Sequence, residues 1–195
     1  MPGSGDYIIA ADGGYAALVS RGISPDLIVG DFDSLAPELL DAVLNHPNVI
    51  RAKVEKDDTD MMLAVRHGLE RGYKTFTING GLGGRLDQTL ANIQILAYLA
   101  GNNARGTLVG RGIGITVICN DKLELNLGVA QGCTVSVFSV GDKAEGVTLK
   151  GLKYPLDNAT ITSDYPIGVS NELTGVPAVI SVRNGTLLII WEGDV

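Results

Sequence analysis

Short apolar runs alternate with helical patterns through the first hundred residues of this sequence, and this alternation limits the fold more than any other feature. The apolar runs have strand character, and the segments between them carry apolar residues at helical spacing. Such an alternation is typical of a mostly parallel sheet with helices packed against it. The expected strands are 7–11, 27–29, 49–54 and 75–78, and the expected helices are 15–21, 37–44, 59–71 and 86–100.

The pattern changes near residue 105. Beyond residue 107, short apolar runs follow one another with turn residues between them and without a long helical pattern, which predicts an antiparallel sandwich or barrel. We therefore expect an α/β fold with a Rossmann-like domain over residues 1–105 and an all-β antiparallel sandwich over residues 106–195. The expected strands of the second domain are 115–119, 122–127, 133–140, 146–152, 159–162, 178–182 and 186–191.

Charge and composition exclude several classes of partner. The net charge of −7 and the pI near 4.7 argue against binding to nucleic acid or to an anionic membrane. No apolar run approaches the roughly 20 residues of a membrane-spanning helix, and the N-terminus lacks the pattern of a secretory signal. Cys119 and Cys133 form no metal-binding or redox motif and lie in apolar, strand-like context, so we expect reduced core residues and a cytoplasmic location.

Acidic or glycine-rich stretches follow each of the first four expected strands. Ligands of open α/β sheets bind beyond the carboxyl ends of the strands, so these stretches are expected to line one site. In an extended segment Asp31 and Asp33 would point the same way, with Phe32 packed on the opposite side, and Asp57 and Asp60 would share a face at a helix start. Carboxylates clustered in this way suit Mg²⁺. The four stretches are ADGG (11–14), GDFDS (30–34), KDDTD (56–60) and GGLGGRLDQ (80–88).

Each of these residues also has a purely structural interpretation. Asp57 or Asp58 could cap the helix at 59–71, and Asp33 could be a turn residue. Arg85 could clamp a phosphate with its planar guanidinium group or form an ion pair with Asp87. The recurrence of such stretches at four strand ends favours a site for a metal ion and phosphate. The helix expected at 86–100 would place Leu90, Ile93, Leu96 and Ala97 on its buried face.

The order and spacing of six motifs resemble those of the thiamine pyrophosphokinase family. The motifs are ADGG, GDFDS, KDDTD, GGRLDQTLANI, GLKYPL (151–156) and SNE (170–172), and they span nearly the whole chain. The resemblance implies an N-terminal ATP-binding α/β domain, a C-terminal β-sandwich, and a homodimer that holds thiamine between the domains and the partner subunit. The implied reaction transfers the pyrophosphoryl group of ATP to the hydroxyl group of thiamine and releases AMP.

The resemblance also implies roles for individual residues. Asp31, Asp33 and Asp60 would bind Mg²⁺, and Asp31, Asp60 and Arg85 would be catalytic, with Asp31 or Asp60 as the candidate acceptor of the hydroxyl proton. Ser170 and Asn171 would lie at the thiamine end. The residues implied to bind ATP, its phosphates or thiamine are Asp12, Gly13, Gly14, Ser34, Asp57, Thr59, Gly84, Arg85, Asp87, Gln88, Ser170 and Asn171.

Three departures from the family pattern keep alternatives open. The family usually has a further βα unit before ADGG, whereas eleven residues precede Asp12 here, and Gln88 stands where many bacterial members carry histidine. Trp191 is offset from the aromatic residue that stacks on the pyrimidine of thiamine in the family. One alternative is an inactive relative that binds thiamine or nucleotide. A second is a phosphohydrolase of the haloacid dehalogenase type, with Asp31 as nucleophile and Asp33 as general acid, although Ser34 breaks that motif.

Overall fold

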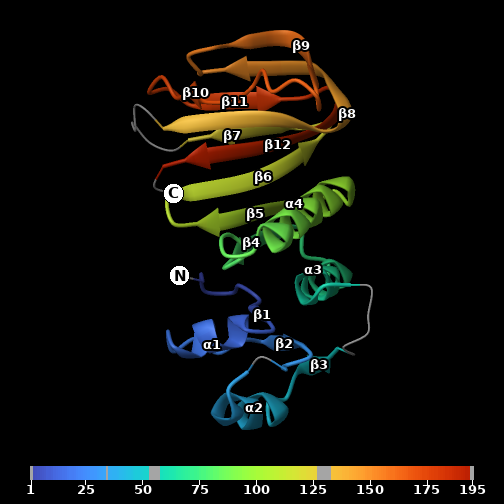
Figure 1. Cartoon of the computed structure of the whole chain (residues 1–195), viewed down its shortest axis with the longest axis vertical. Helices are drawn as coiled ribbons and strands as arrows, with labels where there is room; N and C mark the ends of the chain where they lie inside the picture. Colours follow the sequence, from blue (N-terminus) through green and yellow to red (C-terminus); the bar gives the residue numbers. More distant parts are fainter. Residues whose placement is uncertain (1, 34, 53–57, 127–132, 194–195) are drawn as a thin grey trace. The chain divides into compact units, whose positions relative to one another are not determined.

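The structure is a computed structural model that describes residues 2–33, 35–52, 58–126 and 133–193. It divides into two compact units, Met1–Tyr73 and Lys74–Val195, and each is described by itself (Figure 1). The helices are α1 (Gly14–Val19), α2 (Pro37–Leu44), α3 (Asp60–Glu70) and α4 (Leu86–Gly101). The strands are β1 (Ile9–Ala11), β2 (Leu27–Gly30), β3 (Val49–Arg51), β4 (Thr75–Asn79), β5 (Arg105–Gly110), β6 (Ile113–Cys119), β7 (Lys122–Leu125), β8 (Thr134–Lys150), β9 (Leu156–Thr162), β10 (Asn171–Glu172), β11 (Ala178–Ser181) and β12 (Asn184–Glu192).

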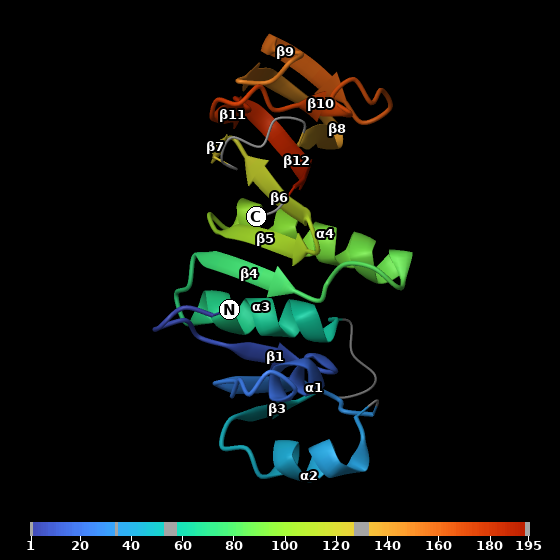
Figure 2. The same ribbon diagram turned by 90° about the vertical axis from the view of Figure 1, so that its left-hand side faces the viewer.

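The first unit contains a parallel sheet of three strands in the order β1-β2-β3 (Figure 2). The central strand β2 is buried along its whole length, because it has a strand on each side and α3 packs against β1 and β2. Ala10, Tyr15, Ile28, Phe32 and Val43 form one cluster of buried residues in this unit. The parallel pairing confirms the expectation for the first three strands, and it brings the loops after β1 and β2 to the same sheet edge.

The second unit contains a mixed sheet of nine strands. Its main path runs β4-β5-β6-β12-β8-β11-β7, with β9 and β10 paired to β8. The pair β4 and β5 is parallel and the other pairs are antiparallel, and α4 packs on β5 and β6. The α/β class is therefore confirmed. The strand expected at 75–78 pairs within the sheet of the C-terminal strands and does not belong to the three-stranded sheet.

Strand β8 corrects the expectation of two separate strands at 133–140 and 146–152. It runs without interruption from Thr134 to Lys150 and pairs with β12 in its first half and with β9 and β11 in its second. Gly141, between the two expected strands, and Gly146, at the start of the second, have φ values of 96° and 68° and lie inside β8. The register with β9 shifts between Glu145 and Val147, so these glycines permit a bulge and not a chain reversal.

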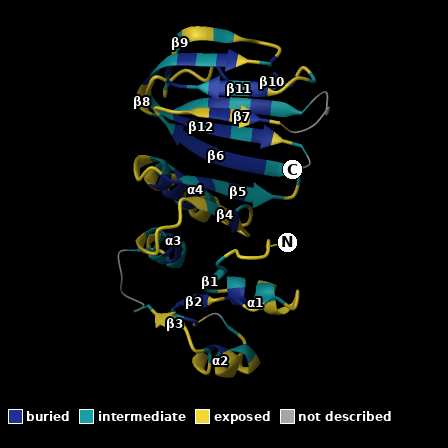
Figure 3. Cartoon of the chain, turned by 180° about the vertical axis from the view of Figure 1, so that it is seen from behind, coloured by how far each residue is buried: buried dark blue, intermediate teal, exposed yellow. Residues whose placement is uncertain are grey.

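The largest cluster of buried residues in the second unit lies among its β-strands, and Figure 3 shows buried residues along most of β6. Trp191 is 5% exposed and belongs to this core. Cys119 and Cys133 are free thiols, and both are half-buried rather than fully inside the core. Within the residues that the structure describes, helices long and apolar enough to cross a membrane do not occur.

Candidate active site

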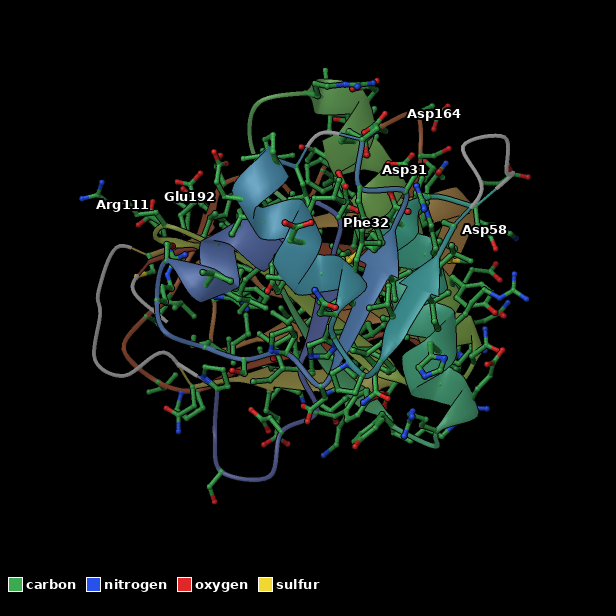
Figure 4. All side chains as sticks on the ribbon, turned by 90° about the horizontal axis from the view of Figure 1, so that it is seen from below. Asp31, Phe32, Asp58, Arg111, Asp164 and Glu192 are labelled. Atoms are coloured by element: carbon green, nitrogen blue, oxygen red, sulfur yellow. The ribbon has the colours of Figure 1, made fainter. Side chains whose placement is uncertain are left out.

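The loop that follows β2 is a turn built around a buried aromatic side chain. Phe32 is 3% exposed and packs into the core of the first unit, and its φ of 65° places its backbone in the left-handed region. The backbone N–H of Asp33 donates a hydrogen bond of 3.2 Å to Oδ1 of Asp31, which closes the turn. Phe32 therefore packs inward as expected, but through a turn rather than an extended segment. Figure 4 labels Asp31 and Phe32 at this turn.

The loop after β1 approaches this turn closely because Gly30 has no side chain. The backbone N–H of Asp12 donates to the carbonyl oxygen of Val29 at 2.8 Å. A Cβ atom on Gly30 would lie 3.1 Å from the Cα of Asp12 and 3.1 Å from the ring of Phe32, which is tighter than most Cβ contacts in proteins. Gly30 thus lets the chain after β1 and the Asp31–Asp33 turn occupy the same end of the sheet.

Three carboxylates converge where these two loops meet. Asp12, Asp31 and Asp33 each offer an oxygen, and these oxygens lie within 4.8 Å of one another. The negative charge of Asp31 raises the pKa of Asp33 above its usual 3.8, and a hydrogen bond with Asp31, slight desolvation and the charges of Asp12 and Asp60 add to this rise. The folded chain therefore holds acidic groups that repel one another, and a bound cation would relieve this repulsion.

The start of α3 adds a fourth acidic residue to this region of the first unit. Thr59 caps the helix, since its Oγ1 accepts a hydrogen bond of 3.1 Å from the N–H of Met62, and Asp60 lies in the first helical turn. Asp58 forms an ion pair of 2.6 Å with Arg66. The alternative that Asp58 caps the helix is therefore wrong. Asp60 affects the pKa of Asp33 but does not belong to the group of three converging carboxylates.

Two other predicted binding residues, Gly13 and Gly14, follow Asp12 directly. Gly13 and Gly14 open helix α1 immediately after Asp12, and a Cβ atom on either would meet nothing within 4 Å. They leave open space beside the backbone at the end of β1. Ser34 and Asp57 lie outside the described residues, so their predicted roles stay predictions.

The glycine-rich loop of the second unit ends in an ion pair at the start of α4. Gly84 has a φ of 72°, and Arg85 is the N-cap residue. The guanidinium group of Arg85 donates two hydrogen bonds to the carboxylate of Asp87, at 3.1 and 2.6 Å, and both side chains are more than half exposed. The hydrogen bonds from Arg85, and then that from the N–H of Gln88, lower the pKa of Asp87. The ion-pair interpretation of Arg85 thus holds in this structure, with the guanidinium group at the solvent.

The sequence interpretation missed a buried asparagine on α4. The buried face of this helix consists of Asn92, Ile95, Leu96 and Leu99, whereas Leu90, expected on that face, is 54% exposed. Asn92 is 7% exposed, and its Nδ2 donates a hydrogen bond of 2.9 Å to the carbonyl oxygen of Gly81 in the glycine-rich loop. The spacing of Asn92 relative to Ile95, Leu96 and Leu99 is the signal that could have placed it on this face.

The SNE segment joins the GLKYPL segment within the second unit. Asn171 is 4% exposed, its Oδ1 accepts from the N–H of Tyr154 at 2.9 Å, and its Nδ2 donates to the carbonyl oxygen of Tyr154 at 2.7 Å. Ser170 is exposed, has a φ of 55°, and donates its N–H to Oγ of Ser136 at 3.1 Å. Trp191 is a core residue, which leaves its ring unavailable for stacking on a ligand in this structure.

The fold and the site define an α/β protein with a carboxylate-lined site at the carboxyl ends of parallel strands, where such folds bind their ligands. The family model "Thiamin pyrophosphokinase, catalytic domain" matches residues 3–108. The model "Thiamin pyrophosphokinase, vitamin B1 binding domain" matches residues 121–187. The chain therefore belongs to the thiamin pyrophosphokinase family, which confirms the resemblance carried by the six motifs.

Relatives with this family name align over most of the chain. A thiamine pyrophosphokinase from Bacillus subtilis (strain 168) is 29% identical over 187 residues, which cover 95% of this chain and 87% of the relative. A crystal structure of the thiamine pyrophosphokinase from Bacillus subtilis is 30% identical, with a TM-score of 0.84 over 96% of this chain and 87% of that one. The structure of the Geobacillus thermodenitrificans protein is also 30% identical, with a TM-score of 0.86 over 99% and 89%.

Proposed function

We propose that this chain transfers the pyrophosphoryl group of ATP to the hydroxyl group of thiamine, giving thiamine diphosphate and AMP. The observation that carries this proposal is the match of both family models to one chain whose Asp12, Asp31 and Asp33 converge at a sheet edge. Pyrophosphoryl transfer needs neutralisation of the triphosphate charge and an aligned nucleophile more than it needs a covalent intermediate. A cluster of carboxylates beside a phosphate-binding edge is suited to that task.

We propose Mg²⁺ as the cofactor, and the residues present fit this ion. Asp12, Asp31 and Asp33 supply hard oxygen ligands close together. The raised pKa of Asp33 reflects repulsion between the carboxylates of Asp33 and Asp31, which a divalent cation would remove. Asp31, Asp33 and Asp60 are the proposed ligands, with Asp12 as a fourth carboxylate at the site. When bound, the ion would neutralise charge on the phosphate oxygens of ATP.

The chain's own residues would orient the reactants and move the proton. We propose Asp31 or Asp60 as the acceptor of the thiamine hydroxyl proton and Arg85 as the clamp for phosphate oxygens. Asp87 holds the guanidinium group of Arg85 through two hydrogen bonds, so the fork is oriented before ATP binds. Gly84, with its left-handed backbone, allows main-chain N–H groups to approach phosphate at the start of α4. The remaining residues proposed to line the ATP site are Asp12, Gly13, Gly14, Ser34, Asp57, Thr59 and Gln88.

The thiamine end is proposed to lie in the C-terminal part of the chain. Ser170 presents an exposed side chain next to Asn171, and both belong to the part of the chain matched by the vitamin B1 binding model. The proposal keeps residues 1–105 as a Rossmann-like ATP-binding domain and residues 106–195 as a β-sandwich that binds thiamine and forms a homodimer. Exposed apolar side chains support a partner subunit, and free cysteines support a cytoplasmic location. The exposed apolar side chains are Tyr154, Tyr165, Ile167, Val169 and Val176.

The test is release of AMP by the purified chain with ATP, with thiamine and Mg²⁺ each present or omitted. We expect AMP only when both are present, and Asp31→Asn to lower kcat by about a hundredfold or more, as for the loss of one electrostatic group in an active site. Asp41→Asn is the matched control, since Asp41 is an exposed aspartate on α2, and it should leave kcat unchanged.

Two results would replace this proposal with one of its alternatives. Thiamine binding measured by calorimetry, without AMP release at saturating ATP, would indicate an inactive relative. A phosphorylated aspartate trapped at Asp31, with release of orthophosphate, would indicate a phosphohydrolase with Asp31 as its nucleophile.

A further inference from the structure

Two buried polar side chains of the second unit each hydrogen-bond to the backbone of a predicted binding segment. The described residues include three buried polar side chains, which are Asn92, Thr116 and Asn171. Thr116 donates from Oγ1 to the carbonyl oxygen of Gly106, inside the sheet, at 2.6 Å. Asn92 and Asn171 instead bond to the backbone of the glycine-rich loop and of the GLKYPL segment. Burial of an amide side chain is unfavourable unless the amide is hydrogen-bonded, so the burial of these two asparagines requires a structural explanation.

The side chain of Asn171 hydrogen-bonds to both the N–H and the carbonyl oxygen of Tyr154. Its Oδ1 also accepts a 3.0 Å hydrogen bond from the N–H of Glu172, so the amide oxygen is fully used inside the chain. Lys153 adds to the attachment, since its N–H donates to the carbonyl oxygen of Glu172 at 2.9 Å and its Nζ pairs with the Glu172 carboxylate at 2.9 Å. The side chain of Tyr154 nevertheless remains 60% exposed. The backbone is fixed while the ring is exposed, with Nζ of Lys153 5.5 Å from its centroid.

The side chain of Asn92 fixes the glycine-rich loop in a comparable way. Its Nδ2 reaches the carbonyl oxygen of Gly81, and a Cβ atom on Gly81 would lie 3.1 Å from that nitrogen and 2.8 Å from Leu108 Cδ2. The loop thus lies directly against α4 and β5 at Gly81. Four residues later it reaches Arg85, the N-cap residue of the same helix. One buried amide therefore holds the loop that leads to the proposed phosphate clamp.

We infer that Asn92 and Asn171 are positioning residues for two different substrates, through the hydrogen bonds of Asn92 to Gly81 and of Asn171 to Tyr154. Asn92 holds the loop that meets the phosphates of ATP, and Asn171 holds the segment that meets thiamine. The inference rests on the proposed function. Neither amide needs to contact a substrate, because a small displacement of a binding loop is enough to weaken binding.

The test replaces each asparagine by the nearly isosteric aspartate. Asn171→Asp keeps the acceptor for the N–H of Tyr154 but places an oxygen against the Tyr154 carbonyl, and Asn92→Asp does the same to Gly81. We expect Asn171→Asp to raise KM for thiamine about tenfold with KM for ATP unchanged, and Asn92→Asp to do the reverse. Asn102→Asp is the matched control, because the exposed amide of Asn102 also donates to a backbone carbonyl, that of Tyr98, and it should change neither KM.

A merely structural role would not produce opposite effects on the two substrates. Equal changes in both KM values, or no change in either variant, would overturn the inference. Where an aspartate variant fails to fold, judged by the fluorescence of the buried Trp191, the neutral variants Asn171→Ser and Asn92→Ser replace it. Calorimetric Kd values for thiamine and for ATP with Mg²⁺ give the same comparison without turnover. An inactive wild type would thus refute the proposed function while the two asparagines are still tested by binding.

Discussion

A methyl group added at Gly114 should severely destabilise the second unit. Gly114 in β6 lies directly opposite Trp191 in β12. A Cβ atom on Gly114 would lie 2.2 Å from both Cε2 and Cζ2 of the indole, whereas ordinary contacts begin at 3.4 Å. To reach an ordinary contact the ring would have to move by 3.4 − 2.2 = 1.2 Å. Trp191 is 5% exposed in a packed core, so the displacement cannot be absorbed without moving its neighbours.

The size of the effect follows from two limits. Overpacking of a core costs about 1–3 kcal/mol when neighbours adjust. Expulsion of the ring resembles truncation of a buried aromatic side chain, which costs about 3–5 kcal/mol. Because both atoms of the clash belong to the rigid indole rather than to a flexible side chain, we expect Gly114→Ala to lower the free energy of unfolding by about 3 kcal/mol, where the two ranges meet.

Tryptophan fluorescence during urea unfolding measures this loss directly. Trp191 is the single tryptophan of the chain, so its emission reports on the second unit alone. Gly101→Ala is the control: Gly101 is the last residue of α4, a Cβ there would meet nothing within 4 Å, and we expect no loss of stability. A loss below about 1 kcal/mol for Gly114→Ala, with an unchanged emission maximum, would refute the packing argument.

A double-mutant cycle separates the clash from other effects of the methyl group. In a Trp191→Leu background the indole atoms nearest to Gly114 are absent, so Gly114→Ala should cost far less than it does with Trp191 present. Equal costs in the two backgrounds would show that the methyl group acts elsewhere.

Three further predictions concern the site. Asp33→Asn should raise the melting temperature of the first unit at neutral pH, because Asp31 raises the folded-state pKa of Asp33 and the two ionised carboxylates repel each other. Scanning calorimetry should show that this gain disappears as the pH falls below 3.8, where Asp33 is protonated in both the folded and the unfolded chain. An equal gain at low pH would contradict this origin. Thr59→Ala should cost about 1 kcal/mol through loss of the α3 cap, whereas Thr59→Ser should cost much less, as measured by chemical unfolding followed by circular dichroism; equal costs would argue against the cap. Arg85→Lys should raise KM for ATP because an ammonium group cannot reproduce the two-pronged hydrogen bonding of a guanidinium group; steady-state kinetics with unchanged KM would remove Arg85 from the proposed site.

The sequence predicted those parts of the fold whose signals are local. Helix α2 begins and ends at the predicted residues, 37 and 44, because Pro37 suits a first helical turn and the apolar spacing ends with the helix. Strand β8 was divided into two because turn residues lie between its two apolar runs, whereas its continuity depends on pairing with β9 and β12, which local sequence does not contain. The buried face of α4 was predicted correctly at Leu96 and wrongly at Leu90, and Asn92 was missed because it is polar.

The site was predictable as a set of residues but not as a geometry. The motifs identified Asp31 and Asp33, yet the close approach of Asp12 depends on the pairing of β1 with β2 and on the missing side chain of Gly30. The attachment of Asn171 to Tyr154 joins positions seventeen residues apart and could not be inferred from spacing. Local patterns specify which chemical groups are present, and long-range packing decides which of them meet.

The products formed from ATP and thiamine test the central claim most directly. Chromatographic analysis of a reaction containing the purified chain and Mg²⁺ should give thiamine diphosphate and AMP in equal amounts, with neither formed when Mg²⁺ is omitted. Formation of thiamine monophosphate with ADP, or of orthophosphate without a thiamine ester, would contradict pyrophosphoryl transfer by this chain.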